Sequence, residues 1–330
     1  MGFFKESSIA MKRNDTITRL RYAAKSALRP AWETAVWVIK MVIPITLGIS
    51  VLEYLGVIGW ISDMIAPLFN RIGLPGSSGL VFLTAALSNN YATVAVIATL
   101  GFDYRSVVIL AVMALICHNL PIESAVQHKT GVSAVGMTLL RLVTAFIAAA
   151  LLNLILPEQM SGTLHLPAAG HTPTSWNEVA ISWITTVVPL CLQIGVIIIA
   201  LNIIQQILRE FHLLDLISVP LRPFMAIFGL PQSTSFLWII SNIVGLTYGG
   251  AALIDEIHRG GISRHDSLLL NTHIAISHSL LEDTVIFYTI GIGLIWLLMP
   301  RILLAICAVW ILRAIQIFIG RSKSLRPSER

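Results

Sequence analysis

The sequence has few charged residues for its length. Only 12% of its 330 residues are Asp, Glu, Lys or Arg, whereas 56% are hydrophobic, and a soluble domain carries about a quarter charged residues. The deficit comes from long apolar segments and not from a polar low-complexity tract. This composition excludes an ordinary soluble domain and predicts a chain that has lipid as its solvent.

Cysteine and catalytic motifs are scarce as well. The three cysteines, Cys117, Cys191 and Cys307, lie in apolar segments and form no CxxC pair, so no disulfide framework is predicted. The sequence lacks the HExxH, GxSxG, Walker and Gly-rich dinucleotide motifs. We therefore expect neither an enzyme nor a bound cofactor. Without an ATPase domain, the expected class is a secondary transporter or channel.

The basic residues concentrate in two tails. They are Lys5, Lys12, Arg13, Arg19, Arg21, Lys25 and Arg29 at one end and Arg321, Lys323, Arg326 and Arg330 at the other. No aromatic residues alternate with them, so no nucleic-acid partner is indicated. Positive residues that flank membrane spans stay on the cytoplasmic side. The tails therefore predict a plasma (inner) membrane protein with both termini in the cytoplasm.

Long apolar runs predict six spanning helices, because about 20 apolar residues cross a bilayer. The runs are roughly 33–57, 106–127, 133–156, 179–207, 267–288 and 297–319. Two further apolar stretches, 76–100 and 232–254, are interrupted by small or polar residues: Ser88, Asn89, Asn90 and Tyr91 in the first, and Ser241, Asn242, Thr247, Tyr248, Gly249 and Gly250 in the second. Unwound backbone at membrane depth must be buried or line a wet cavity. Both stretches are predicted to be re-entrant helical hairpins; the alternative is a plain spanning helix with a polar patch.

An internal repeat organises the chain. Its first half matches its second half at Gly73-Leu74-Pro75 and Gly229-Leu230-Pro231, Ser77 and Ser233, His118 and His278, Leu120 and Leu280, Glu123 and Asp283, Gly131 and Gly291, and Arg141 and Arg301. The separation is 156 residues in the first group and 160 in the later pairs. The difference falls in the loop after each predicted hairpin.

The charge distribution predicts how the repeats are oriented. The connector between them has no Lys or Arg and therefore reads as extracytoplasmic, so each repeat crosses the membrane an odd number of times. Three spanning helices and one re-entrant hairpin in each repeat satisfy this condition and give two inverted-topology repeats. This topology puts Lys129, Arg209, Arg222, Arg259 and Arg264 inside and only Arg71, Arg105 and Arg301 outside. The predicted divisions are a basic tail at 1–30, repeat 1 at 31–157, a connector at 158–178, repeat 2 at 179–320 and a basic tail at 321–330.

Ionisable residues within membrane segments are functional candidates by default. They occur at equivalent places, in Cys117-His118-Asn119-Leu120-Pro121-Ile122-Glu123 and in Ser277-His278-Ser279-Leu280-Leu281-Glu282-Asp283. His278 and Glu282 are four residues apart, on one face of a helix. His118 and Glu123 share a face only if Pro121 distorts the helix. A pseudo-two-fold axis brings both clusters toward one polar pocket with Asn89, Asn90, Ser241, Asn242, Thr247 and Tyr248.

These motifs resemble the nucleoside-recognition, or gate, family of membrane proteins over about 35–320. The resemblance rests on the Gly-Leu-Pro entries, the Ser-Asn hairpin centres and the two His-containing helix breaks. It implies an all-α integral membrane fold related to the membrane part of ferrous-iron transporter B. It also implies a relation to spore maturation proteins A and B, as if the two were fused in one chain. The cysteine-bearing gate motifs and the GTPase domain of the iron transporter are not evident here.

The expected function is transport of a small polar solute or ion across the bilayer. Imidazole and carboxylate ligands suit divalent metals such as iron, so the lead substrate class is a divalent metal ion, held by His118, Glu123, His278, Glu282 and Asp283. The other expected substrate-binding residues are Asn89, Asn90, Asn119, Ser241, Asn242 and Thr247. Two alternatives stay open: a permease for a nucleoside or another polar organic solute, and a non-transporting membrane assembly partner. A homo-oligomer is also left open.

Overall fold

The computed structural model describes residues 2–166 and 175–324, and no strand occurs within these ranges. The predicted all-α class is therefore confirmed for the described chain. The α-helices are α1 (Gly2–Tyr54), α2 (Val57–Phe69), α3 (Ser78–Leu87), α4 (Asn90–Leu100), α5 (Tyr104–Cys117), α6 (Leu120–Lys129), α7 (Ala134–Ile155), α8 (Trp176–Glu210), α9 (Leu213–Ile227), α10 (Ser235–Ile243), α11 (Leu246–His258), α12 (Arg264–Ser277), α13 (Glu282–Thr289) and α14 (Leu294–Ser324). Short 3-10 turns, Asn70–Ile72 and Gln232–Thr234, precede α3 and α10.

Five helical segments within the described residues are long and apolar enough to cross a membrane. They are Thr16–Tyr54, Tyr104–Lys129, Ala134–Ile155, Trp176–Glu210 and Leu294–Phe318. The sixth predicted helix, 267–288, is divided between α12 and α13 by a break at residues 278–281. The first spanning helix also begins earlier than predicted, because α1 extends back to Gly2 through the basic tail. These segments make the chain a multi-pass membrane protein.

The two interrupted apolar stretches each form a pair of short helices. In the first, α3 packs against α4 across Ser88 and Asn89, and in the second, α10 packs against α11 across Val244 and Gly245. The Asn89 side chain caps α4 by accepting a hydrogen bond from the Ala92 amide at 2.9 Å. Gly245 occupies the same place before α11 with a φ of 105°, which favours glycine. The polar interruption at Ser88 and Asn89 thus ends one helix and begins the next, whereas the second turn falls between the predicted polar residues, at Val244 and Gly245.

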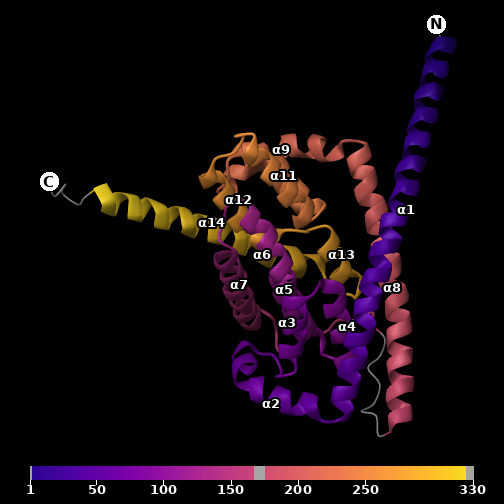
Figure 1. Ribbon diagram of the computed structural model, residues 1–330, viewed down its shortest axis with the longest axis vertical. Helices are drawn as coiled ribbons and strands as arrows, with labels where there is room; N and C mark the ends of the chain where they lie inside the picture. The colour runs from indigo at the N-terminus through magenta and orange to yellow at the C-terminus, as the bar shows by residue number, and fades with distance from the viewer. Residues whose placement is uncertain (1, 167–174, 325–330) are drawn as a thin grey trace.

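Apolar burial places α5 at the centre of the helix arrangement. Every residue from Ser106 to Cys117 is buried, and α5 contacts α3, α4, α7, α12 and α14. The two longest helices, α1 and α8, pack along each other at one side, as Figure 1 shows. Their outer faces carry exposed apolar side chains such as Leu192 and Val196, as lipid contact requires. The polar residues in and around α5 are therefore shielded by helices on several sides.

Candidate functional site

Two helix breaks, one in each half of the chain, build the site. The first separates α5 from α6 at His118 and Asn119, and the second separates α12 from α13 at His278 and Ser279. Asn119 and Ser279 both take left-handed backbone conformations, with φ of 49° and 53°. Non-glycine residues rarely adopt this region, so the two breaks share an unusual local geometry.

Each break is held by the neighbouring pair of short helices through the same backbone hydrogen bond. The Asn119 amide donates to the Ala85 carbonyl at 2.9 Å, and the Ser279 amide donates to the Ser241 carbonyl at 3.1 Å. A further bond from the Leu281 amide to the Asn242 carbonyl, at 3.1 Å, fixes the second break. Backbone groups freed by breaking a helix are thereby satisfied within the protein.

A fully buried arginine lies against the end of the helix that precedes each break. Arg141 donates to the Ile116 carbonyl at 2.8 Å and to the His118 carbonyl at 2.5 Å. Arg301 donates to the His278 carbonyl in the same way. Both arginines have no exposed surface. Cations at helix C-termini interact favourably with the helix dipole and with the unpaired carbonyls, which accounts for these two contacts.

The two histidines point their rings in equivalent ways. His118 Nδ1 lies 3.0 Å from the Ala114 carbonyl, and His278 Nδ1 lies 2.8 Å from the Ile274 carbonyl. Because a carbonyl oxygen only accepts hydrogen bonds, each ring donates from Nδ1. The Nε2 atoms then face the interior of the site. The ring centroids are 5.0 Å apart.

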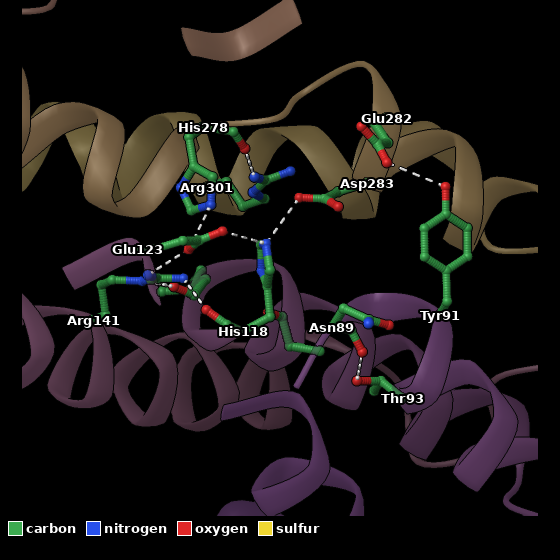
Figure 2. Close-up of polar contacts among 12 residues, drawn as sticks. Asn89, Tyr91, Thr93, His118, Glu123, Arg141, His278, Glu282, Asp283 and Arg301 are labelled. Atoms are coloured by element: carbon green, nitrogen blue, oxygen red, sulfur yellow. Dashed lines mark hydrogen bonds and ion pairs between the residues drawn. The ribbon is translucent and has the colours of Figure 1, made fainter. Parts of the chain in front are cut away.

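The imidazole Nε2 atoms pair with carboxylates from the opposite half of the chain, as Figure 2 shows. His118 Nε2 lies 3.2 Å from Asp283 Oδ2, and His278 Nε2 lies 3.0 Å from Glu123 Oε2. His118 also contacts Glu123 of its own half at 3.3 Å. The four side chains are all buried. These contacts join the two halves of the protein at their polar centre.

Glu123 is the most highly connected acid of this cluster. Besides both histidines, it contacts Arg141, with Nη1 2.6 Å from Oε2. One ligand atom each from His118, Glu123 and His278 lie within 4.8 Å of one another. This arrangement is compact enough to hold a metal ion, although Arg141 already supplies a positive charge to Glu123.

A polar cavity of about 310 Å³ adjoins the cluster. Glu282 lies in its wall and accepts hydrogen bonds from the Tyr91 hydroxyl at 3.2 Å and from the Gln205 amide at 3.3 Å. The other lining residues are Pro30, Thr34, Asn89, Asn90, His118, Asn119, Glu123, Asn202, Val244, Gly245, Leu246, Tyr248, Ser279 and Asp283. The cavity therefore receives residues from both breaks, both short-helix pairs, α1 and α8.

The predicted site residues fall into three groups in the structure. His118, Glu123, His278 and Asp283 form the cluster, and Asn89, Asn90, Asn119 and Glu282 line the cavity beside it. Ser241 and Asn242 bond to carbonyls of their own helix, at 2.8 and 2.7 Å, and do not line this cavity. The side chain of Thr247 lies outside the described residues.

One expectation needs correction. His278 and Glu282 do not share a helix face, because the helix is broken between them, and Glu282 contacts Tyr91 instead. Arg301, predicted on the extracytoplasmic side, is fully buried against the second break. The expected distortion near Pro121 does occur, because α5 ends at Cys117 and α6 begins at Leu120.

Sequence reasoning left several residues out of the site. Arg141 and Arg301 each follow a site histidine by 23 residues, and this equal spacing within apolar segments was the available signal. Tyr91 and Gln205 reach Glu282 from 191 and 77 residues away along the chain. No spacing rule connects residues at such separations.

The helices and the buried polar centre define the class as a helical multi-pass membrane protein with a buried cluster of ionisable side chains. Residues 35–127 match the family described as "Gate: Nucleoside recognition". The "uncharacterized membrane protein YvoD" of Bacillus subtilis (strain 168) is 31% identical over 269 residues, which cover 81% of this chain and 86% of that protein. No solved structure matches the chain significantly. The chain therefore belongs to the nucleoside-recognition (gate) family of membrane proteins, and the resemblance noted from its motifs is confirmed.

Proposed function

We propose that this protein is a membrane transporter that moves a small polar solute through two inverted repeats, 31–157 and 179–320. One observation carries the proposal. Three repeat-equivalent pairs, His118 and His278, Glu123 and Asp283, and Arg141 and Arg301, meet beside a polar cavity. Transporters built from inverted repeats bind their substrates near the bilayer midplane, between discontinuous helices.

The recurrence of contacts supports the inverted-repeat proposal. The amide-to-carbonyl bond from Asn119 to Ala85 recurs as the bond from Ser279 to Ser241. The positions are related by 160 and 156 residues, the separations found between the sequence motifs. In this proposal, the α3–α4 and α10–α11 pairs are re-entrant hairpins, both termini are cytoplasmic, and the membrane is the plasma (inner) membrane. Rocking of one repeat against the other would alternate access to the cavity.

A divalent metal ion is the second candidate substrate, and the histidine geometry favours it. Each histidine donates from Nδ1 to a backbone carbonyl, as metal-binding histidines commonly do. Each Nε2 then faces a carboxylate at 3.0–3.2 Å. The imidazole Nε2 and the carboxylate oxygen both present electron pairs to each other. A positive charge between them, from a proton or a metal ion, therefore makes the contact favourable. Ferrous iron falls within this class.

Uptake into proteoliposomes carrying purified protein tests the proposal. We expect accumulation of at least one solute from a panel of uridine, adenosine, small amines, and ferrous, manganous and zinc ions, above the level in empty liposomes. Uptake restricted to the metals would make the second candidate the function. Uptake restricted to nucleosides would make the protein a nucleoside permease. No uptake by folded protein would contradict transport and support an assembly role in the membrane.

A further inference from the structure

The cavity has an unbalanced set of charged side chains. Three carboxylic acids line it, Glu123, Glu282 and Asp283, whereas no Lys or Arg is among its lining residues. The two buried arginines lie behind the cavity wall, against the helix breaks. Glu123 and Asp283 have the histidines and Arg141 as positive or protonatable partners, whereas no ion pair to Glu282 occurs among the described residues. An uncompensated charge in a buried polar site is costly, so one positive charge on a bound solute would balance it.

Glu282 is the acid best placed to meet a solute. Glu123 pairs with Arg141 and both histidines, and Asp283 pairs with His118. The contacts of Glu282 are two neutral donors, Tyr91 and Gln205. Its side chain is only partly exposed and lines the cavity. A carboxylate accepts about four hydrogen bonds, so Glu282 retains capacity for a further donor.

Asn90 supplies an independent sign of a missing ligand. Its side chain lines the cavity and is 1% exposed, and neither its amide nitrogen nor its amide oxygen has a hydrogen-bond partner among the described residues. Buried polar groups are almost always satisfied, and leaving them unpaired costs free energy. The amide oxygen of Asn90 can accept a hydrogen bond from a solute that enters the cavity.

We propose that the solute is a small organic amine with a single positive charge, whose ammonium group binds Glu282 and Asn90. This inference rests on the transport function proposed above and names its substrate class. The cavity, at about 310 Å³, is large for a bare ion and lies at the lower end of the range of small-molecule sites. The ring of Tyr91 in its wall suits an organic cation as well.

Calorimetric titration of the full-length protein in lipid nanodiscs tests this inference. The probes are tyramine and ethanolamine, with tyrosol and ethylene glycol as uncharged analogues of matched size, and with putrescine, sodium and manganous ions added separately. We expect saturable binding of at least one of the two amines. We expect its uncharged analogue, putrescine and the metal ions to bind at least about tenfold more weakly, the loss typical of one charge-assisted hydrogen bond.

Two variants make the assignment to Glu282 specific. Glu282→Gln keeps the side-chain shape and should weaken amine binding at least about tenfold. Glu53→Gln removes an acid of α1 that does not line the cavity, and it should leave binding unchanged. Both variants are first compared with the wild type by thermal unfolding and gel filtration.

Three results would overturn the inference: no amine binding by folded protein, equal binding of amine and uncharged analogue, or undiminished binding by a folded Glu282→Gln variant. If uridine or a metal ion is taken up by liposomes while no amine binds, the amine assignment fails and transport stands. If nothing binds and nothing is taken up, both proposals fail.

Discussion

Replacing Arg141 with methionine is expected to lower the free energy of unfolding by about 3–5 kcal/mol, the cost of removing one partner from a buried ion pair. Methionine retains much of the length of the side chain but no charge. The Ile116 and His118 carbonyls would lose their donor, and Glu123 would lose the positive charge that lies 2.6 Å from it. Equilibrium unfolding in mixed detergent micelles measures the change.

A second substitution separates the charge from the packing of Arg141. Adding Glu123→Gln to Arg141→Met removes the carboxylate that has lost its arginine and should restore part of the lost stability, because contacting residues are coupled. Arg71→Met is the matched control. Arg71 is exposed, so its replacement should change stability by less than about 0.5 kcal/mol. Equal effects at positions 71 and 141 would contradict the role given to the buried arginine.

Replacing His278 with alanine is expected to lower the initial rate of solute uptake at least about tenfold. The variant removes the contact to Glu123 that joins the second break to the first half of the protein, and it leaves a buried acid with one partner fewer. Initial rates in proteoliposomes, taken with the solute that the wild-type protein accumulates, measure the effect.

His212→Ala is the control for that measurement. The His212 side chain is 81% exposed and pairs with Asp215 at the start of α9, far from the cluster along the chain. Its replacement should leave uptake unchanged. If His278→Ala folds normally and transports at the wild-type rate, the histidine pair only joins the helix breaks and does not take part in transport.

The helical architecture was largely predictable because lipid imposes a length on every apolar segment. Five predicted spans correspond to long helices, and the polar interruptions at Ser88 and Asn89 do separate α3 from α4. The break at 278–281 was indicated only through the family resemblance, and the apolar run 267–288 otherwise predicted one continuous helix. No proline marks it, and its stability depends on carbonyls of Ser241 and Asn242 that are distant in sequence.

The residues of the cluster were predictable from the sequence, but the pairing of each histidine with its acid was not. The repeat singled out His118, Glu123, His278 and Asp283, which do come together. That each histidine pairs with an acid of the other half depends on the packing of two helix breaks, which periodicity does not reveal. The arginines were also missed as site residues. A charged residue in an apolar segment predicts a buried partner. The sequence does not show which residue that partner is.

The central claim is that the two halves have opposite orientations in the membrane and so present their equivalent residues to each other. Labelling of single cysteines with a membrane-impermeant maleimide tests it most directly, in a protein whose Cys117, Cys191 and Cys307 are replaced by alanine. His128→Cys and Tyr288→Cys occupy exposed, repeat-equivalent positions 160 residues apart. We expect labelling of the Tyr288→Cys variant in intact cells and of the His128→Cys variant only after permeabilisation. Labelling of both variants from the same side would contradict the inverted arrangement.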